Sequence, residues 1–187
     1  MHIWRNRGLR TLFVVALVLG VTSVPAAIAS SAPISDNMDI EPLDQWHFEH
    51  NASYGAGGFE YNQGFALSPQ NNAWLAATNG WSALRRYIRI PAGNDPNIYD
   101  LCTASIYIKP AVNDSVTFNL EVLDPYTYQY IALRQVTLLK GGYKQVSVSW
   151  RSEFDYVYVR FALLSNNGYY KKARLDNFYV FCQNTPL

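Results

Sequence analysis

The sequence predicts an all-β fold, an antiparallel β-sandwich or barrel, for the chain that follows its first 29 residues. Apolar and polar residues alternate with a period of two in several runs, as in strands that bury one face. Clusters of turn-forming residues separate these runs, at 91–94, 110–114, 141–142 and 165–168. Beyond residue 29 no stretch keeps a helical period for three turns. Many short strands with turns between them are typical of sandwiches and barrels.

Five runs are predicted as strands: 81–90, 101–109, 115–123, 144–150 and 156–163. One face of each run is apolar. In chain order, the residues of these apolar faces are Leu84, Ile88 and Ile90; Cys102, Ala104, Ile106 and Ile108; Val116, Phe118, Leu120 and Val122; Val146, Val148 and Trp150; and Val157, Val159, Phe161 and Leu163. The other face of each run is polar or aromatic. The apolar faces must be covered, so the sheets must pack on each other or on another apolar surface.

The first 29 residues have the three parts of a secretory signal peptide. Arg5, Arg7 and Arg10 form a positively charged start, and an apolar run follows at 11–21. Ala27 and Ala29 are the small residues that a signal peptidase reads, so we expect cleavage after Ala29. The apolar run is shorter than the roughly 20 residues that span a bilayer, which makes an uncleaved anchor the weaker alternative. We therefore expect a secreted protein with a single domain, residues 30–187.

The chain has two cysteines, Cys102 and Cys182. An even pair in an exported protein is most simply a disulfide, and two buried free thiols are the alternative. The spacing does not fit a redox CxxC motif, and two thiols are too few for a structural zinc site.

The charge balance points away from a nucleic-acid partner. The whole chain has 15 Lys and Arg against 14 Asp and Glu. Loss of the leader removes three arginines and no acid, so 12 of the 15 basic residues remain against 14 acids, a net charge of −2. No basic stripe is present, and a nucleic-acid binder would be expected to have one. We also expect no membrane span after cleavage.

Four segments, in order, resemble motifs of the jelly-roll carbohydrate-binding modules that accompany cellulases and xylanases. Residues 37–41 with Trp46 resemble an NGDFE…W opening, 98–109 a tYtlsfwvKa strand, 143–146 a Wqkvt segment and 173–180 a closing fylDdvsv strand. Met38, Ile40 and Tyr143 depart from these motifs. The resemblance spans nearly all of residues 30–187 and implies a galactose-binding-like jelly-roll sandwich. This fold also serves in enzymes, receptors and scaffolds.

The resemblance also implies a structural calcium ion between the first and last strands, held by Glu41 and Asp176. Calcium takes six to eight oxygen ligands, which carboxylates and loop carbonyls supply. In the alternative, Asp176 accepts backbone hydrogen bonds at the start of a strand and Glu41 is solvated. The sequence leaves both open.

The outward faces of the predicted strands carry the residue types that bind sugars. Aromatic rings match the C–H faces of a pyranose, and planar polar groups match its hydroxyls. The predicted ligand-binding residues are Trp81, Arg85, Tyr87, Tyr107, Tyr156, Tyr158 and Arg160. Asn119 and Glu121 would add hydrogen-bonding groups, and the loop aromatics Trp74, Tyr126, Tyr128, Tyr169 and Tyr170 could extend the surface. This prediction requires the strands to share one sheet.

The function predicted from these residues is non-catalytic binding of a polysaccharide or a cell-surface glycan. A protein-interaction or structural domain is the first alternative, because tyrosine and arginine also mark protein interfaces and ordinary sheet faces. A small lyase or hydrolase is the second, in which Tyr158 and Arg160 would act on a uronate. No GxSxG elbow is present, and His47 and His50 would point to opposite faces of one strand.

Overall fold

The computed structural model describes residues 33–38, 45–68, 70–90, 98–112, 115–152 and 154–186. The predicted signal peptide and Glu41 lie outside these residues. The strands within them are β1 (Ile34–Asp36), β2 (His47–His50), β3 (Tyr54–Tyr61), β4 (Asn71–Thr78), β5 (Gly80–Arg89), β6 (Ile98–Pro110), β7 (Ser115–Leu123), β8 (Tyr130–Leu139), β9 (Lys144–Ser152), β10 (Tyr156–Ser165) and β11 (Lys171–Pro186). The described part of the chain holds no apolar helix of the length that crosses a bilayer.

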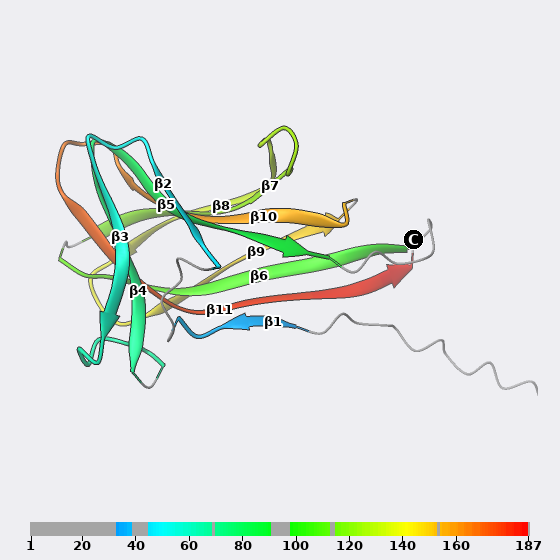
Figure 1. The fold of residues 1–187 in the computed structure, drawn as a ribbon, viewed down its shortest axis with the longest axis horizontal. Helices are drawn as coiled ribbons and strands as arrows, with labels where there is room; N and C mark the ends of the chain where they lie inside the picture. The colour runs from blue at the N-terminus through cyan, green and yellow to red at the C-terminus, as the bar shows by residue number, and fades with distance from the viewer. Residues whose placement is uncertain are drawn as a thin grey trace, which may run out of the picture.

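The strands form two antiparallel sheets, which confirms the predicted sandwich (Figure 1). Sheet A has the order β3-β4-β11-β6-β9, and β1 pairs with the far part of β11. Sheet B has the order β2-β5-β10-β7-β8. Sequence neighbours often lie in different sheets: β4 and β5 are separated by one residue, yet β4 joins sheet A and β5 joins sheet B. This alternation is how a jelly roll closes its sandwich.

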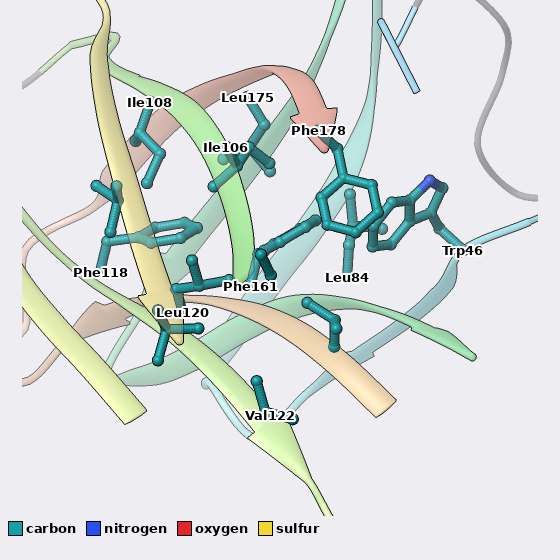
Figure 2. Close-up of a cluster of buried hydrophobic side chains, with 14 of the residues drawn as sticks. Trp46, Leu84, Ile106, Ile108, Phe118, Leu120, Val122, Phe161, Leu175 and Phe178 are labelled. Atoms are coloured by element: carbon teal, nitrogen blue, oxygen red, sulfur yellow. The ribbon is translucent and has the colours of Figure 1, made fainter. Parts of the chain in front are cut away.

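The core lies between the two sheets and is made by the predicted apolar faces. Figure 2 shows the cluster, in which Phe118, Leu120 and Phe161 of sheet B meet Ile106 and Leu175 of sheet A. Trp46 enters this cluster from outside the predicted strands. Its ring lies 4.8 Å from that of Phe161 and 4.9 Å from that of Phe178, measured between centroids. Aromatic contacts of this kind add to the stabilisation that burial alone provides.

The predicted disulfide is present. Cys102 on β6 lies directly opposite Cys182 on β11, and both side chains are buried on the core side of sheet A. No free cysteine remains among the described residues. The two cysteines are 80 residues apart in sequence, so the bond closes a long loop of the unfolded chain and restricts its conformations.

One charged residue of a predicted strand faces inward. Arg86 lies on the same side of β5 as Leu84 and Ile88, and it donates from Nη1 to Asp36 Oδ2 at 3.2 Å. Trp46 donates from Nε1 to the same oxygen at 2.8 Å. Burial lowers the pKa of Arg86, and the nearby Asp36 carboxylate opposes this. The pair ties β1 to sheet B, so the short first strand bridges both sheets.

The strands β3, β4 and β8 are not identified by period-two alternation. In β3 the run from Gly55 to Gly58 reads as a turn, but its glycines are needed for packing. A Cβ on Gly57 would lie 2.8 Å from the ring of Phe48, and one on Gly58 would lie 3.2 Å from that of Trp74. The two rings therefore cover the backbone of β3, which is why small residues form a strand here.

Candidate functional site: the outer face of sheet B

Six of the seven predicted ligand-binding residues lie on one surface, the outer face of sheet B. The register places Tyr87 on β5 opposite Tyr158 on β10, and Arg85 opposite Arg160. Since alternate residues of a strand share a face, Trp81 and Tyr156 lie on the same side. We call the outward side chains of β2, β5, β10, β7 and β8 the sheet B face.

A chain of hydrogen bonds crosses this face and joins side chains of four of its five strands, β8, β7, β10 and β2. Gln135 on β8 donates to Asn119 Oδ1 at 3.0 Å, and Asn119 donates to Glu121 Oε1 at 2.9 Å. Arg160 donates from Nε to the other oxygen of Glu121 and from Nη1 to Glu49 Oε1 at 3.1 Å. Side chains fixed in this way lose little freedom when a ligand binds, which favours affinity.

Ala83 makes the longest of these contacts possible. Arg160 is on β10 and Glu49 is on β2, and β5 lies between these strands. On β5 the residue opposite Glu49 is Ala83, whose small side chain leaves room for the arginine to lie across the sheet. Ala162 is the neighbour of Ala83 on β10. Two adjacent alanines thus form a low strip that the longer side chains cross.

Five tyrosines cluster at one end of the sheet B face: Tyr87, Tyr126, Tyr128, Tyr156 and Tyr158. The rings of Tyr87 and Tyr156 lie 4.7 Å apart, and those of Tyr128 and Tyr158 are stacked at 5.6 Å. The guanidinium of Arg85 lies 4.4 Å from the centre of the Tyr158 ring. Half of the Tyr87 side chain and 72% of that of Tyr126 are exposed. The cluster therefore presents aromatic surface to solvent, and Tyr126 and Tyr128 extend it as predicted.

Trp81 lies on the opposite side of the polar chain from the tyrosine cluster. The guanidinium of Arg160 is 5.1 Å from the centre of its ring. The face thus has aromatic rings on both sides of a polar strip. Arg85 has a buried Nε atom with no hydrogen-bond partner among the described residues, and the closest carboxylate oxygen, Glu49 Oε2, is 3.7 Å away.

The surroundings shift the pKa of three groups on this face, Tyr156, Tyr158 and Arg160. A hydrogen bond with Tyr126, together with burial, raises the pKa of Tyr156 to about 12. Burial and the neighbouring Tyr128 raise the pKa of Tyr158. For Arg160, burial would lower the pKa, but Glu121 and Glu49 outweigh it and raise it. The two phenols stay protonated, which is the wrong state for a catalytic base.

Tyr107, the seventh predicted residue, is not on this face. It lies on β6 in sheet A, opposite Asp176 and Gln145. The prediction that its strand shares a sheet with the others is therefore wrong. Trp74 is also in sheet A, on β4, and Tyr170 packs against Tyr54 at 5.9 Å. Period two gives the face of a strand but does not give its sheet.

Two residues that the sequence did not indicate contribute to the face: Glu49 on β2 and Gln135 on β8. Glu49 lies between two histidines in a four-residue strand, and β8 has no clear alternation. Only the pairing of β2 with β5 and of β8 with β7 brings them to the site. The sequence could not indicate that Glu49 lies near Arg85 and Arg160, because it does not give the order of the strands in the sheet.

Asp176 takes the alternative role that the sequence left open. Its side chain is fully buried, and Oδ2 accepts hydrogen bonds from the backbone N–H groups of Leu67 and Ser68 at 2.7 and 3.1 Å. Oδ1 accepts from the N–H of Asn177 at 2.8 Å. Burial nevertheless raises the pKa of Asp176. These bonds fix the loop after β3 to the bulge in β11.

Of the two residues predicted to hold calcium, Asp176 is the one that the structure describes. The oxygens of Asp176 already accept from three N–H donors, and among the described residues no group of three or more His, Cys, Asp or Glu is placed to hold a metal ion. Glu41 lies outside those residues. Calcium binding stays a prediction, and a melting curve with and without chelator would test it.

Comparisons with known proteins agree with the fold. No family model matches the chain, and no curated protein matches it in sequence. Among solved structures, the chain is similar to the CBM22-1 xylan-binding domain of Paenibacillus barcinonensis Xyn10C, with a TM-score of 0.59 and 10% identity over 80% of this chain and 92% of that one. It is also similar to TmCBM61, solved in complex with β-1,4-galactotriose, with a TM-score of 0.50 and 15% identity over 72% and 86% of the two chains.

A third similar structure is the K1 cleaved adhesin domain of Lys-gingipain from Porphyromonas gingivalis W83, with a TM-score of 0.55 and 10% identity over 80% of this chain and 98% of that one. At these identities the likeness concerns the fold. The chain has the jelly-roll β-sandwich fold of carbohydrate-binding modules.

Proposed function

We propose that this protein is a secreted, non-catalytic module that binds an extended polysaccharide or cell-surface glycan across the sheet B face. The observation that carries the proposal is the juxtaposition of exposed tyrosine rings with a hydrogen-bonded chain of polar side chains from four strands. Rings bind the apolar faces of sugars, and fixed amides, carboxylates and guanidinium groups bind their hydroxyls.

The shape of the face supports a chain-like ligand. The aromatic groups lie at two separated places, the tyrosine cluster and Trp81, with the polar strip between them. From Tyr156 to Leu164, which is paired with Trp81, is eight residues along β10. At about 3.3 Å per residue this is roughly 26 Å, longer than a single sugar ring requires. Several consecutive units of a glycan would therefore contact the face together.

The electrostatics of the face support binding without catalysis. Both carboxylates of the face, Glu49 and Glu121, are held by Arg160. Glycoside hydrolysis needs two carboxyl groups that flank the bond to be cleaved, and a lyase needs a base. The raised pKa of Tyr158 argues against its use as that base.

Export is supported by the buried disulfide between Cys102 and Cys182, because such bonds persist in oxidising compartments. Mass spectrometry of the protein recovered from the medium tests the leader. We expect the mature chain to begin at Ser30, and an intact Arg-rich start would contradict secretion by this route.

A glycan array with residues 30–187 tests binding. We expect retention of a related set of polysaccharides or oligosaccharides, and we expect Tyr158→Ala to weaken it by about fivefold or more, since one aromatic contact is worth about 1 kcal/mol or more. Trp81→Ala should act in the same direction. Tyr61→Ala is the matched control, because Tyr61 is 53% exposed but lies on β3 of sheet A.

Silence of the wild-type protein across plant, microbial and animal glycans would overturn the proposal. Full binding by Tyr158→Ala and Trp81→Ala would place the glycan elsewhere. In the first case the exposed tyrosines would favour a protein partner, since aromatic residues and arginine are enriched at protein interfaces.

A further inference from the structure

The outer surface of sheet A has a hollow of about 610 Å³, on the side of the molecule opposite to the sheet B face. It lies over β1, β11, β6 and β9, where β11 exchanges one neighbour for another. Up to Leu175 the strand pairs with β4, and from Phe178 it pairs with β1. The register with β6 shifts between Asp176 and Tyr179 at this point, and Asn177 has a φ of 47°. The bulge opens the surface between the two partners.

The walls of this hollow are made of tyrosine rings and carboxamides. Its main lining side chains are Tyr107, Tyr179, Asn37, Gln45, Gln145 and Asn177. Tyr179 is 42% exposed, so aromatic surface is available to a ligand. Ser35, Tyr179 and Ser105 stand side by side on β1, β11 and β6, and Tyr107 and Gln145 form the next row. The polar groups are therefore carried by paired strands and not by a loop alone.

The hollow carries no uncompensated charge on its lining residues. Asp36 is the charged residue among them, and both of its oxygens are engaged. Oδ1 accepts from the N–H of Met38 at 2.9 Å, while Oδ2 accepts from Trp46 and from Arg86. Within the described ranges, neither lysine nor arginine lines the hollow. This differs from the sheet B face, where Arg85, Arg89 and Arg160 stand against two glutamates.

We propose that this hollow is a second binding site, which takes a short neutral saccharide of one or two pyranose rings. Its volume falls in the range of small-molecule sites, and aromatic rings beside carboxamides and hydroxyls match the C–H faces and hydroxyl groups of a sugar. The absence of basic lining residues selects against acidic sugars, because a buried carboxylate without a cationic partner is costly. The site is independent of the sheet B face, since the sandwich separates them.

The experiment measures saccharide binding at the hollow in a variant whose sheet B face is weakened by substitution. The host is residues 30–187 with Tyr158→Ala, labelled with ¹⁵N, and the probes are cellobiose, xylobiose, β-1,4-galactobiose and maltose. We expect at least one probe to give saturable shifts of the side-chain NH₂ signals of Gln145 and Asn177. Digalacturonic acid is the charged comparison, and we expect it to bind more weakly than the best neutral probe.

Variants then assign the signal to the hollow. Added to the host, Tyr107→Ala should weaken binding about tenfold, the effect of losing one ring contact, whereas Tyr107→Phe should retain most of it. Tyr61→Ala serves as the control on sheet A outside the hollow. If Tyr107→Ala does not fold, Gln145→Ala on the exposed side of β9 replaces it, with the same direction expected.

The proposal is overturned if none of the neutral probes shifts these signals, if Tyr107→Ala and Gln145→Ala leave the binding unchanged, or if the digalacturonate binds as well as the best neutral probe. These results do not depend on the glycan array. If no glycan on the array binds but a neutral probe gives saturable shifts at the hollow, the proposed function is wrong and this second site stands. If glycans bind on the array but no probe shifts the signals at the hollow, the proposed function stands and the second site is wrong.

Discussion

The two sheets each carry a glutamate bound by an arginine beside a tryptophan, but the two groups differ in the aromatic residues that surround them. On sheet A the group comprises Glu60, Asn72, Trp74, Lys172 and Arg174, which we call the Glu60 cluster. Its Arg174 is 9% exposed, donates to Glu60 at 2.5 Å and has its guanidinium 3.9 Å from the centre of the Phe65 ring. On the sheet B face Tyr87, Tyr126 and Tyr128 are half-exposed or more.

The comparison separates two uses of the same residue types. The Glu60 cluster joins β3, β4 and β11, because Glu60 accepts from Asn72 at 3.1 Å and from Lys172 at 2.7 Å as well as from Arg174. Its cations lie over rings, with Lys172 4.5 Å from the centre of Trp74. In the Glu60 cluster the charged groups pair with one another, which suits stability, whereas the sheet B face presents the rings of Tyr87, Tyr126 and Tyr128 to solvent.

The largest expected effect is on the frame that both faces share. Replacement of Cys102 and Cys182 together by alanine should lower the free energy of unfolding by about 4.5 kcal/mol, from the loss of the loop constraint between β6 and β11. Denaturant unfolding at equilibrium measures this. Glycan binding at temperatures well below the melting point should stay unchanged, and a loss of binding without unfolding would mean that the disulfide shapes the sheet B face.

The second largest effect tests whether the Glu60 cluster stabilises the fold without taking part in glycan binding. Glu60→Gln leaves the buried Arg174 without its charged partner and should destabilise the fold by about 3 kcal/mol. Glycan retention per folded molecule should not change. The control is Asp155→Asn, since Asp155 is exposed, and it should alter stability by less than about 0.5 kcal/mol. Loss of binding in Glu60→Gln would show that sheet A takes part in the proposed glycan site.

The same residue predicts a dependence on acid. Burial alone would raise the pKa of Glu60, but hydrogen bonds from Arg174, Lys172 and Asn72 outweigh it and lower the pKa from 4.5 to about 2. A lowered folded-state pKa gives stability that is fully present above pH 4.5 and is lost as the pH falls toward 2. The stability gap between wild type and Glu60→Gln should therefore narrow by about 2 kcal/mol over this interval. A constant gap in unfolding experiments would contradict the ion pairs.

The smallest change acts on the sheet B face alone. Ala83→Leu fills the strip that Arg160 crosses to reach Glu49, so the polar chain should break while every aromatic ring remains. We expect glycan binding to fall about tenfold, with a loss of stability of about 1 kcal/mol from overpacking. Ser149→Leu, at an exposed position on β9 of sheet A, is the matched control. Unchanged binding in Ala83→Leu would mean that the rings suffice without the ordered polar strip.

Much of this fold could be predicted from local pattern. The alternation in β5, β6, β7, β9 and β10 identified both the strands and their buried faces. It failed in β4, where Asn72 and Ala76 are buried on the side opposite to Leu75, so neither face reads as polar. It also gave no place to Arg86, because an arginine on the apolar side breaks the alternation and its partner Asp36 lies 50 residues away.

The sequence by itself determined the class of the fold, the disulfide partners and the side on which Trp81, Tyr87 and Tyr158 would stand. Only the tertiary structure decided which strands share a sheet. In the folded protein Tyr107 lies in sheet A, away from the sheet B face, and Glu49 contacts Arg160. The hollow beside the bulge in β11 likewise depends on which strands are paired. The physical reason is that period two follows from the local geometry of one strand, whereas sheet order depends on backbone hydrogen bonds that any two strands can make.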